Sequence, residues 1–143
     1  MTKCSDIMTS DLVYNLRNDT VSEVAQTMKN EDIGPVLIVD DGPDGKRLVG
    51  IVTDRDLAIK VVGEGRDPQT TRVEDVMTTE LVVCRAEDDV QAAMQAMSEY
   101  QLRRIPVISA DGLLVGIISQ ADIATRIDQP EQTAEVVREI SED

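Results

Sequence analysis

The sequence predicts an α+β protein built from two tandem copies of one β-α-β-β-α unit. Residues 6–13 read DIMTSDLV, and residues 75–82 repeat this pattern as DVMTTELV. Residues 50–56 read GIVTDRD, and residues 116–122 repeat that pattern as GIISQAD. Two copies are too few for a solenoid, which needs about three or more repeats. We therefore expect two copies that face each other about a pseudo-twofold axis, with two related clefts.

Length and composition fit a small globular protein with an aliphatic core. The chain has 143 residues, of which 41% are hydrophobic, with two Tyr, no Phe and no Trp. Each copy alone would be marginal in size, which favours a fused pair. The scarcity of aromatic residues argues against nucleic-acid binding by base stacking. The net charge of −14 disfavours nucleic acid and anionic membranes as partners.

Each copy is expected to form a short strand, a helix, a two-stranded hairpin and a second helix. The first helix of copy one begins at the capping box Thr20-Val-Ser-Glu23. Its counterpart begins at Asp88 or Asp89, and both helices carry apolar residues, including methionines of the core, at helical spacing. Apolar runs predict strands at residues 12–14, 36–39 and 48–52, and at 81–84, 105–108 and 114–118. The second helices are expected over residues 54–62 and 120–127.

The two copies differ in length inside the hairpin, where the first has residues 40–47 and the second has residues 109–112. A turn tolerates such an insertion at small entropic cost. A polar stretch with Gly and Pro separates the copies. We therefore divide the chain into a first repeat at 1–62, a linker at 63–72, a second repeat at 73–128 and an acidic C-terminal helix at 129–143.

Several kinds of chemistry find no support in the sequence. There is no His, which removes the commonest general base and metal ligand. Cys4 and Cys84 are far apart and show no CxxC spacing, so we expect two unpaired reduced thiols, no disulfide and no zinc site. The N-terminus has no apolar signal region, and no apolar run is long enough to cross a bilayer. We expect a cytoplasmic protein without a membrane partner.

The motif with the clearest chemical meaning is the doubled pattern of Gly, two aliphatic residues, Thr or Ser, and Asp three positions later. A Gly inside a strand marks a bulge or a close approach by another backbone or a ligand. Thr53 with Asp56, and Ser119 with Asp122, could simply cap the helices that follow. Alternatively, the hydroxyls and helix N-termini could meet a phosphate while the carboxylates accept hydrogen bonds from a ribose diol.

Taken together, the ordered and doubled motifs resemble those of the cystathionine-β-synthase (CBS) domain family, whose tandem pair is often called a Bateman module. The resemblance rests on the Asp-Ile-Met-Thr start, the strand Ile105-Pro106-Val107 and the doubled Gly motif, and it covers residues 5–128. The segment TDRDLAIKVVGEGRDP is similar to small stand-alone bacterial CBS-pair proteins. This resemblance implies disc-shaped homodimers that bind AMP, ADP or ATP in clefts between the repeats.

Carried over by position, the resemblance implies that Thr53 and Ser119 bind phosphate or ribose and that Asp56 and Asp122 bind ribose. Each cleft draws on both repeats. Thr9 and Ile33, Gly34 and Pro35 would face Ser119 and Asp122, whereas Thr78 and Leu102, Arg103 and Arg104 would face Thr53 and Asp56. Adenine would lie against aliphatic side chains, namely Leu12, Val13, Val36, Leu81, Val82 and Ile105.

The copies also differ in charge. Arg55 has Ala121 as its counterpart, and Arg103 and Arg104 replace the Gly and Pro of the first copy. If the clefts mix repeats in this way, the cleft of Thr53 gathers the cations. It would then bind the more phosphorylated ligand.

We carry three functional hypotheses forward. The first is a non-enzymatic regulatory module that binds an adenine nucleotide and signals to a separate effector protein by a change of conformation. The second is a ligand-free module for protein interaction or dimerisation, in which the motifs are only helix caps. The third, an enzyme, has no catalytic residues that we can assign: the chain lacks His, a Walker loop and a nucleophile elbow.

Overall fold

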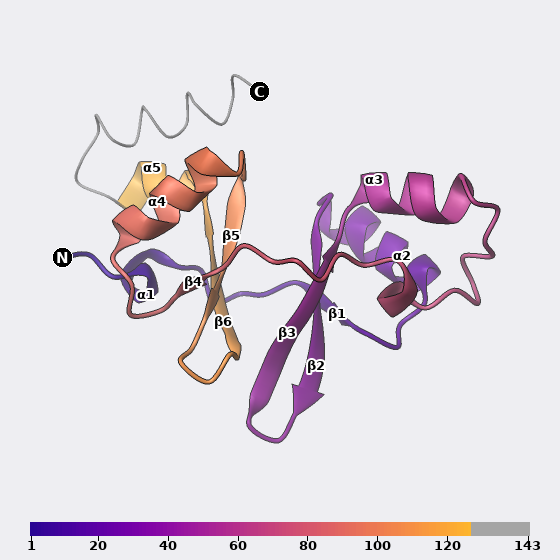
Figure 1. The fold of residues 1–143 in the computed structure, drawn as a ribbon, viewed down its shortest axis with the longest axis horizontal. Helices are drawn as coiled ribbons and strands as arrows, with labels where there is room; N and C mark the ends of the chain where they lie inside the picture. Colours follow the sequence, from indigo (N-terminus) through magenta and orange to yellow (C-terminus); the bar gives the residue numbers. More distant parts are fainter. Residues whose placement is uncertain (127–143) are drawn as a thin grey trace. The chain divides into compact units, whose positions relative to one another are not determined.

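The computed structural model describes residues 1–126, and it confirms the mixed α+β architecture with two three-stranded sheets (Figure 1). The chain forms two compact units that do not coincide with the sequence repeats. Unit 1 combines Met1–Leu12 with the chain from Val82 onward, and unit 2 is Val13–Leu81. The helix expected after Pro130 lies outside the described residues.

Unit 2 holds a sheet in the order β1-β2-β3, with β1 parallel and β3 antiparallel to β2. Helix α2 packs on β2 and on η1. The core of this unit is mostly valine: Val21, Val24, Val36, Ile38, Val52, Val61, Val73 and Val76. Its elements are β1 (Tyr14–Leu16), α2 (Val21–Glu31), β2 (Val36–Gly42), β3 (Gly45–Val52), α3 (Asp54–Asp56), η1 (Leu57–Val62) and η2 (Val73–Asp75).

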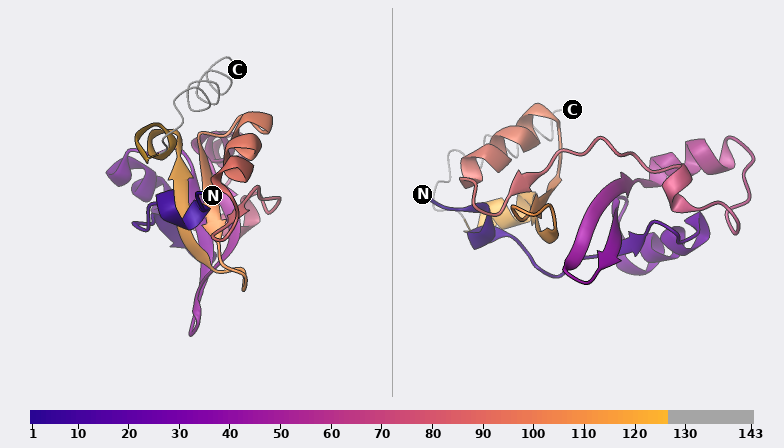
Figure 2. Two further views of the ribbon diagram at one scale, coloured as in Figure 1. Left: turned by 90° about the vertical axis from the view of Figure 1, so that its left-hand side faces the viewer. Right: turned by 60° about the horizontal axis from the view of Figure 1, so that its bottom comes forward.

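Unit 1 repeats this plan with the order β4-β5-β6, again with one parallel and one antiparallel pair. Helices α1, α4 and α5 gather against the sheet (Figures 1 and 2). The methionines Met94 and Met97 are buried in the core, as the sequence predicted. The elements are α1 (Cys4–Ile7), β4 (Cys84–Arg85), α4 (Val90–Glu99), β5 (Arg104–Ile108), β6 (Leu114–Ser119) and α5 (Gln120–Arg126). The short helix α1 was not predicted.

The predicted starts of the first helices are confirmed. The backbone N–H of Glu23 donates to the Thr20 hydroxyl at 3.2 Å, and the N–H of Gln91 donates to the Asp89 carboxylate at 3.0 Å. Each side chain therefore satisfies a backbone donor that a helix N-terminus leaves unpaired. Between the two candidate caps of α4, the structure selects Asp89.

Three strand predictions need correction. Strands β1 and β4 begin two or three residues later than the apolar runs at 12–14 and 81–84 suggested, because these runs contain the points where the chain passes from one unit to the other. The inserted residues 40–47 are not an open turn. They extend the ladder of β2 and β3 as far as the pair Gly42–Gly45, so the insertion lengthens the hairpin.

The segments that precede β1 and β4 are exchanged between the repeats. Thr9, in the first repeat, pairs antiparallel with Ile117 on β6 through hydrogen bonds of 2.8 and 3.0 Å. Thr78, in the second repeat, pairs in the same way with Ile51 on β3, at 2.8 and 3.0 Å. Each compact unit therefore needs strand-forming residues from both repeats.

The strand glycines explain how these segments fit. A Cβ on Gly116 would stand 2.9 Å from the Met8 Cβ, and a Cβ on Gly50 would stand 2.9 Å from the Met77 Cγ. Both glycines also lie next to a register shift in the strand pairing. The expected bulge is therefore present at both glycines. The group nearest to each glycine is a methionine side chain of the doubled Asp-x-Met-Thr motif, and not the expected backbone or ligand; at Gly50 the Thr78 carbonyl oxygen follows at 3.2 Å.

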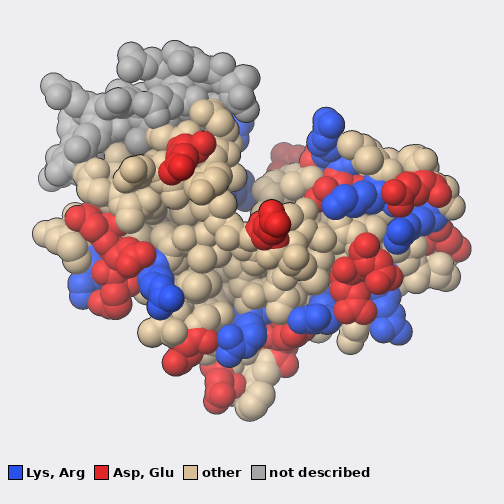
Figure 3. Space-filling model, viewed as in Figure 1, with Lys and Arg blue, Asp and Glu red and all other residues tan. Residues whose placement is uncertain are grey.

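Charged side chains of both signs are interspersed on the face shown in Figure 3. Although the net charge is −14, the acidic side chains do not form one continuous patch on this face. Within residues 1–126, no helix combines the length and the apolar character that a bilayer crossing requires.

The contact of Met8 with Gly116 makes a prediction about stability. Gly116→Ala should lower the free energy of unfolding by about 1–3 kcal/mol, because the new methyl group overlaps the Met8 side chain. In a Met8→Gly background, which also removes the Met8 Cβ, the same change should cost clearly less. Urea denaturation of the four proteins of this double-mutant cycle measures the difference.

Gly42→Ala is the matched control, since its added Cβ would meet its nearest atom at an ordinary 3.7 Å. An equal cost of Gly116→Ala in both backgrounds would show that the methionine contact does not matter.

Candidate functional site

In unit 1, the second copy of the doubled Gly motif forms a reciprocal cap at the junction of β6 and α5. The N–H of Asp122 donates to the Ser119 hydroxyl at 3.1 Å, and the N–H of Ser119 donates to the Asp122 carboxylate at 2.9 Å. The spacing of three residues places each side chain over the backbone of the other. The capping role considered from the sequence is therefore present.

Asp122 also accepts a hydrogen bond from the exchanged segment. The Thr9 hydroxyl donates to the second carboxylate oxygen of Asp122 at 3.2 Å. The structure thus brings together three of the predicted site residues, Thr9, Ser119 and Asp122, within one compact unit. They come from both sequence repeats, as expected.

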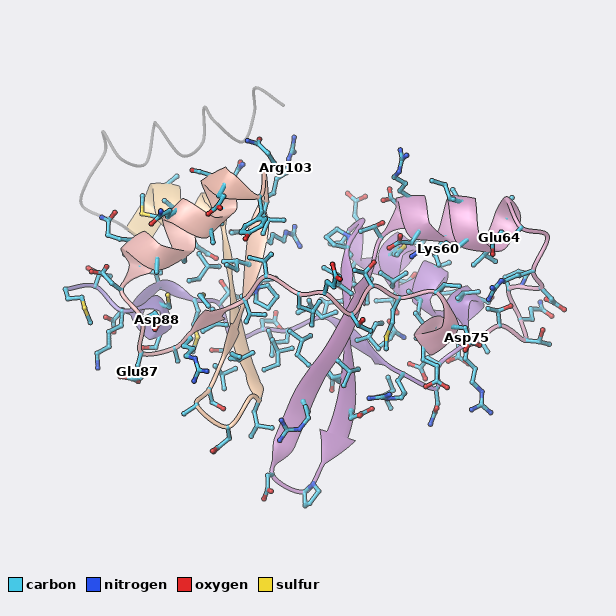
Figure 4. All side chains as sticks on the ribbon, in the orientation of Figure 1. Lys60, Glu64, Asp75, Glu87, Asp88 and Arg103 are labelled. Carbon is cyan, nitrogen blue, oxygen red and sulfur yellow. The ribbon has the colours of Figure 1, made fainter. Side chains whose placement is uncertain are left out.

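Arg103 and Arg104 lie beside this cap. Arg104 begins β5 and stands opposite Ser119 in the antiparallel register, and the N–H of Gln120 donates to the Arg103 carbonyl at 3.1 Å. Both arginines are exposed, and Figure 4 shows Arg103 at the end of α4 where the chain enters β5. The β5–β6 pairing therefore places the backbone of Arg104 opposite Ser119 and the backbone of Arg103 next to Gln120.

In unit 2, Thr53 and Asp56 form the same reciprocal cap, at 3.1 and 3.0 Å. Thr78 pairs with Ile51 through an isolated β-bridge, and Ile51 lies two residues before Thr53 in the sequence. The Lys60 ammonium lies 3.4 Å from the free Asp56 oxygen (Figure 4). This lysine occupies the carboxylate edge that in unit 1 receives Thr9.

Gly34 and Pro35 of unit 2 lie next to an acidic side chain. A Cβ on Gly34 would stand 3.2 Å from an Asp54 carboxylate oxygen. At the corresponding position of the motif, unit 1 has the uncharged Gln120. The cap of unit 2 is thus flanked by Asp54, Gly34 and Pro35, with the exposed Arg55 nearby in sequence.

Within each unit, the residues are grouped differently from the sequence-based expectation. Leu102, Arg103 and Arg104 lie with Ser119, and Ile33, Gly34 and Pro35 lie with the Thr53 motif. The physical reason is the hairpin, because the residues that enter its first strand pair with the end of its second strand. The expected placement of the three-residue segments across repeats stays a prediction.

The aliphatic residues proposed to contact adenine fall into two classes. Val36 and Ile105 have no exposed surface and belong to the two cores, so in this conformation they are not available to a ligand. Leu12, Val13, Leu81 and Val82 are half-buried. These four remain candidates for contact with a base.

Sequence reasoning missed Gln120. Its side-chain nitrogen is buried and has no hydrogen-bond partner among the described residues. A buried donor without a partner is uncommon in folded proteins and is costly. The sequence did contain a hint that this position is special, because Gln120 stands where the first copy of the motif has the charged Asp54.

Comparison with known proteins places these features in context. The family profile described as CBS domain matches residues 4–63 and 73–129. Hypoxic response protein 1 of Mycobacterium tuberculosis is 36% identical over 127 residues, which cover 89% of this chain and 86% of that protein. The crystal structure of hypoxic response protein I with two coordinated zinc ions has a TM-score of 0.76 and 37% identity, over 89% of this chain and all of that one.

Two similar structures hold adenosine compounds. CBSX2 in complex with AMP has a TM-score of 0.72 and 25% identity, covering 87% of this chain and 94% of that one. The CBS domain pair of MJ0100, in complex with 5'-methylthioadenosine and S-adenosyl-L-methionine, has a TM-score of 0.68 and 27% identity over the same shares. Within residues 1–126 of this chain, no group of three or more His, Cys, Asp or Glu side chains is arranged to hold a metal ion.

The cap in unit 1 makes a second prediction about stability. Asp122→Ala should lower the free energy of unfolding by about 1–2 kcal/mol without any ligand, because it removes the cap and the Thr9 contact together. Asp122→Asn should cost less, because its amide oxygen still accepts a hydrogen bond.

Urea denaturation measures both variants, with the exposed Glu80→Ala as the control. If Asp122→Ala unfolds at the same urea concentration as Glu80→Ala, the cap contributes nothing to stability.

Proposed function

This chain belongs to the CBS-domain family and carries two CBS domains, and we propose that it is a non-enzymatic regulatory module for an adenosine-containing nucleotide of the AMP, ADP or ATP class. The observation that carries the proposal is the cluster in unit 1, where Thr9, Ser119 and Asp122 meet beside Arg103 and Arg104. Hydroxyl and carboxylate groups suit a ribose, and guanidinium groups suit a phosphate.

The charge around each cap favours unit 1 for the phosphates. Arg103 and Arg104 begin the strand that pairs with the unit 1 cap, and the residue after Ser119 is the uncharged Gln120. In unit 2, Asp54 replaces that amide and would repel a phosphate, while Lys60 is already engaged with Asp56. We therefore propose that the phosphates bind at the Ser119 cap. The sequence had predicted the opposite, because the family resemblance placed Arg103 and Arg104 beside Thr53.

The exchanged segment suggests a regulatory step. Thr9 lies on that segment and donates to Asp122, so a ligand that contacts both would favour the state in which the segment is docked in unit 1 over a state in which it is released. A ligand can shift a conformational equilibrium only through such a difference in affinity. A separate effector protein would detect the change.

A ligand-free interaction module remains the second candidate. Both caps are complete without a ligand, because each hydroxyl and each carboxylate finds its partner inside the protein. These residues could therefore serve stability alone. The binding experiment below distinguishes the two functions.

Isothermal titration with ATP, AMP and adenosine tests the proposal directly. We expect binding. We expect Arg104→Ala to lower the affinity for ATP by about 10–100-fold, because the change removes a hydrogen bond between charged groups. Adenosine, which lacks phosphate, should bind Arg104→Ala and the natural protein alike. The control is Arg66→Ala, which removes an exposed arginine of the linker.

Two outcomes would redirect the proposal. Absence of binding by all three compounds, in folded and ligand-free protein, would leave the motifs as structural caps and favour the interaction module. An equal loss for ATP and adenosine in Arg104→Ala would mean that the arginine does not recognise phosphate.

We further propose that two copies of the chain associate through the exposed face of η1. Ile59 and Val62 are 50% and 78% exposed and lie one helical turn apart, next to the exposed Ala58. Apolar side chains that cluster on a surface helix commonly mark an interface. The homodimers implied by the family resemblance support this assignment.

Light scattering after size exclusion tests the interface. Val62→Glu should shift the protein from dimer to monomer, because a carboxylate would be buried without a partner. Leu16→Glu, at a less exposed apolar position away from this face, should leave the dimer intact. A dimer that survives Val62→Glu would place the interface elsewhere.

A further inference from the structure

The two cysteines of the chain, expected to be unrelated, lie together in the core of unit 1. Cys4 opens α1 and has no exposed surface, and Cys84 in β4 is 5% exposed. The backbone explains their proximity. The N–H of Cys4 donates to the Asp88 carbonyl at 2.8 Å, and the N–H of Ser5 donates to the Ala86 carbonyl at 2.9 Å. Residues 4 and 5 therefore run beside the turn that follows Cys84 (Figure 4).

The two side chains belong to the same buried cluster of unit 1. The Cys4 thiol donates to the Asp89 carbonyl at 3.9 Å, and the Cys84 thiol donates to the Pro106 carbonyl at 3.7 Å. The two thiols influence each other's ionisation, because the nearby Cys84 lowers the pKa of Cys4 and the nearby Cys4 raises the pKa of Cys84. Cys4 is therefore the thiol that loses its proton more readily.

We propose that Cys4 and Cys84 are a redox pair, which a hydroperoxide converts into an intramolecular disulfide. The Cys4 thiolate attacks the peroxide, the O–O bond breaks, and water or an alcohol leaves while Cys4 becomes a sulfenic acid. The Cys84 sulfur then attacks the Cys4 sulfur, the S–O bond breaks, and the released hydroxide leaves as water with the Cys84 proton. Two thiols are oxidised by two electrons in total, and one hydroperoxide is reduced.

Access to the buried thiols requires local opening of residues 3–5. Opening would break the backbone hydrogen bonds of Cys4 and Ser5 and the exposed Lys3–Glu87 ion pair. The segment lies near the chain terminus, and α1 is a single helical turn of four residues. Such elements open more readily than a core strand. Oxidation should accordingly be slow in the native protein and governed by this opening.

The disulfide would join the exchanged segment covalently to the second repeat. Cys4 precedes the Met8–Gly116 contact by only four residues and the Thr9–Asp122 contact by five. Oxidation would therefore fasten the segment that supplies Thr9 to unit 1. This inference does not depend on whether a nucleotide binds there.

The test is peptide mapping of the natural protein after exposure to hydrogen peroxide, with the remaining thiols alkylated before digestion. We expect a linked peptide pair containing Cys4 and Cys84, a monomeric product on a non-reducing gel and full reversal by dithiothreitol. The thermal midpoint of the oxidised protein should rise, because the cross-link restricts the unfolded chain.

Single variants assign the order of the steps. Cys84→Ser should accumulate a sulfenic acid on Cys4 that reacts with dimedone, whereas Cys4→Ser should leave Cys84 unmodified under the same conditions. Circular dichroism confirms that each variant is folded. The proposal is overturned if the natural folded protein keeps both thiols free, forms only intermolecular disulfides, or is oxidised to sulfinic acid without a cross-link.

Discussion

The structure depends on one constraint, which is that each compact unit takes up a segment of the other sequence repeat, paired with its sheet by a β-bridge. The segment 8–9 enters unit 1 through the Thr9–Ile117 backbone pair, with the Met8 side chain over Gly116. The segment 77–78 enters unit 2 in the same way, with Met77 over Gly50. A side chain at either glycine position would occupy the space that the methionine needs. The glycine and the Asp-x-Met-Thr motif, which lie far apart in the sequence, are therefore two halves of one packing contact. This explains why both of them appear twice.

The same constraint builds the candidate site. Once Met8 is seated, the next residue, Thr9, donates its hydroxyl to Asp122, and Asp122 caps the helix that follows Ser119. Packing, capping and the proposed ligand contacts thus involve the same few residues. A mutation in this cluster is expected to change stability as well as any binding, so binding experiments need measurements of folding beside them. The unit 2 cluster shares the cap and differs in its surroundings, because Lys60 lies at the second oxygen of Asp56 and Asp54 stands by Gly34. The two copies of the motif therefore differ in local charge.

Thr9 and Cys4 both lie on the segment of the first repeat that belongs to unit 1. A ligand that contacts Thr9 and a bond that holds Cys4 would therefore act on the same structural element. Chemical signals of different kinds could bias one equilibrium in this arrangement.

The sequence by itself determined the doubled unit, the starts of the first helices at Thr20 and Asp89, and the capping partnership of Ser119 with Asp122. These features depend on neighbours within a few residues, so local spacing and capping chemistry are enough to predict them. Only the tertiary structure decided which residues meet across long separations. It placed Arg104 opposite Ser119, because the first residue of β5 pairs with the last residue of β6 in the hairpin. It turned the inserted residues 40–47 into a longer ladder because strand pairing satisfied their backbone groups. It brought Cys4 to Cys84, and it left the Gln120 amide buried without a described partner. The hairpin registers depend on which strand residues pair, and the approach of Cys4 to Cys84 spans eighty positions and needs the exchanged segment in place, so local pattern could not reveal these outcomes.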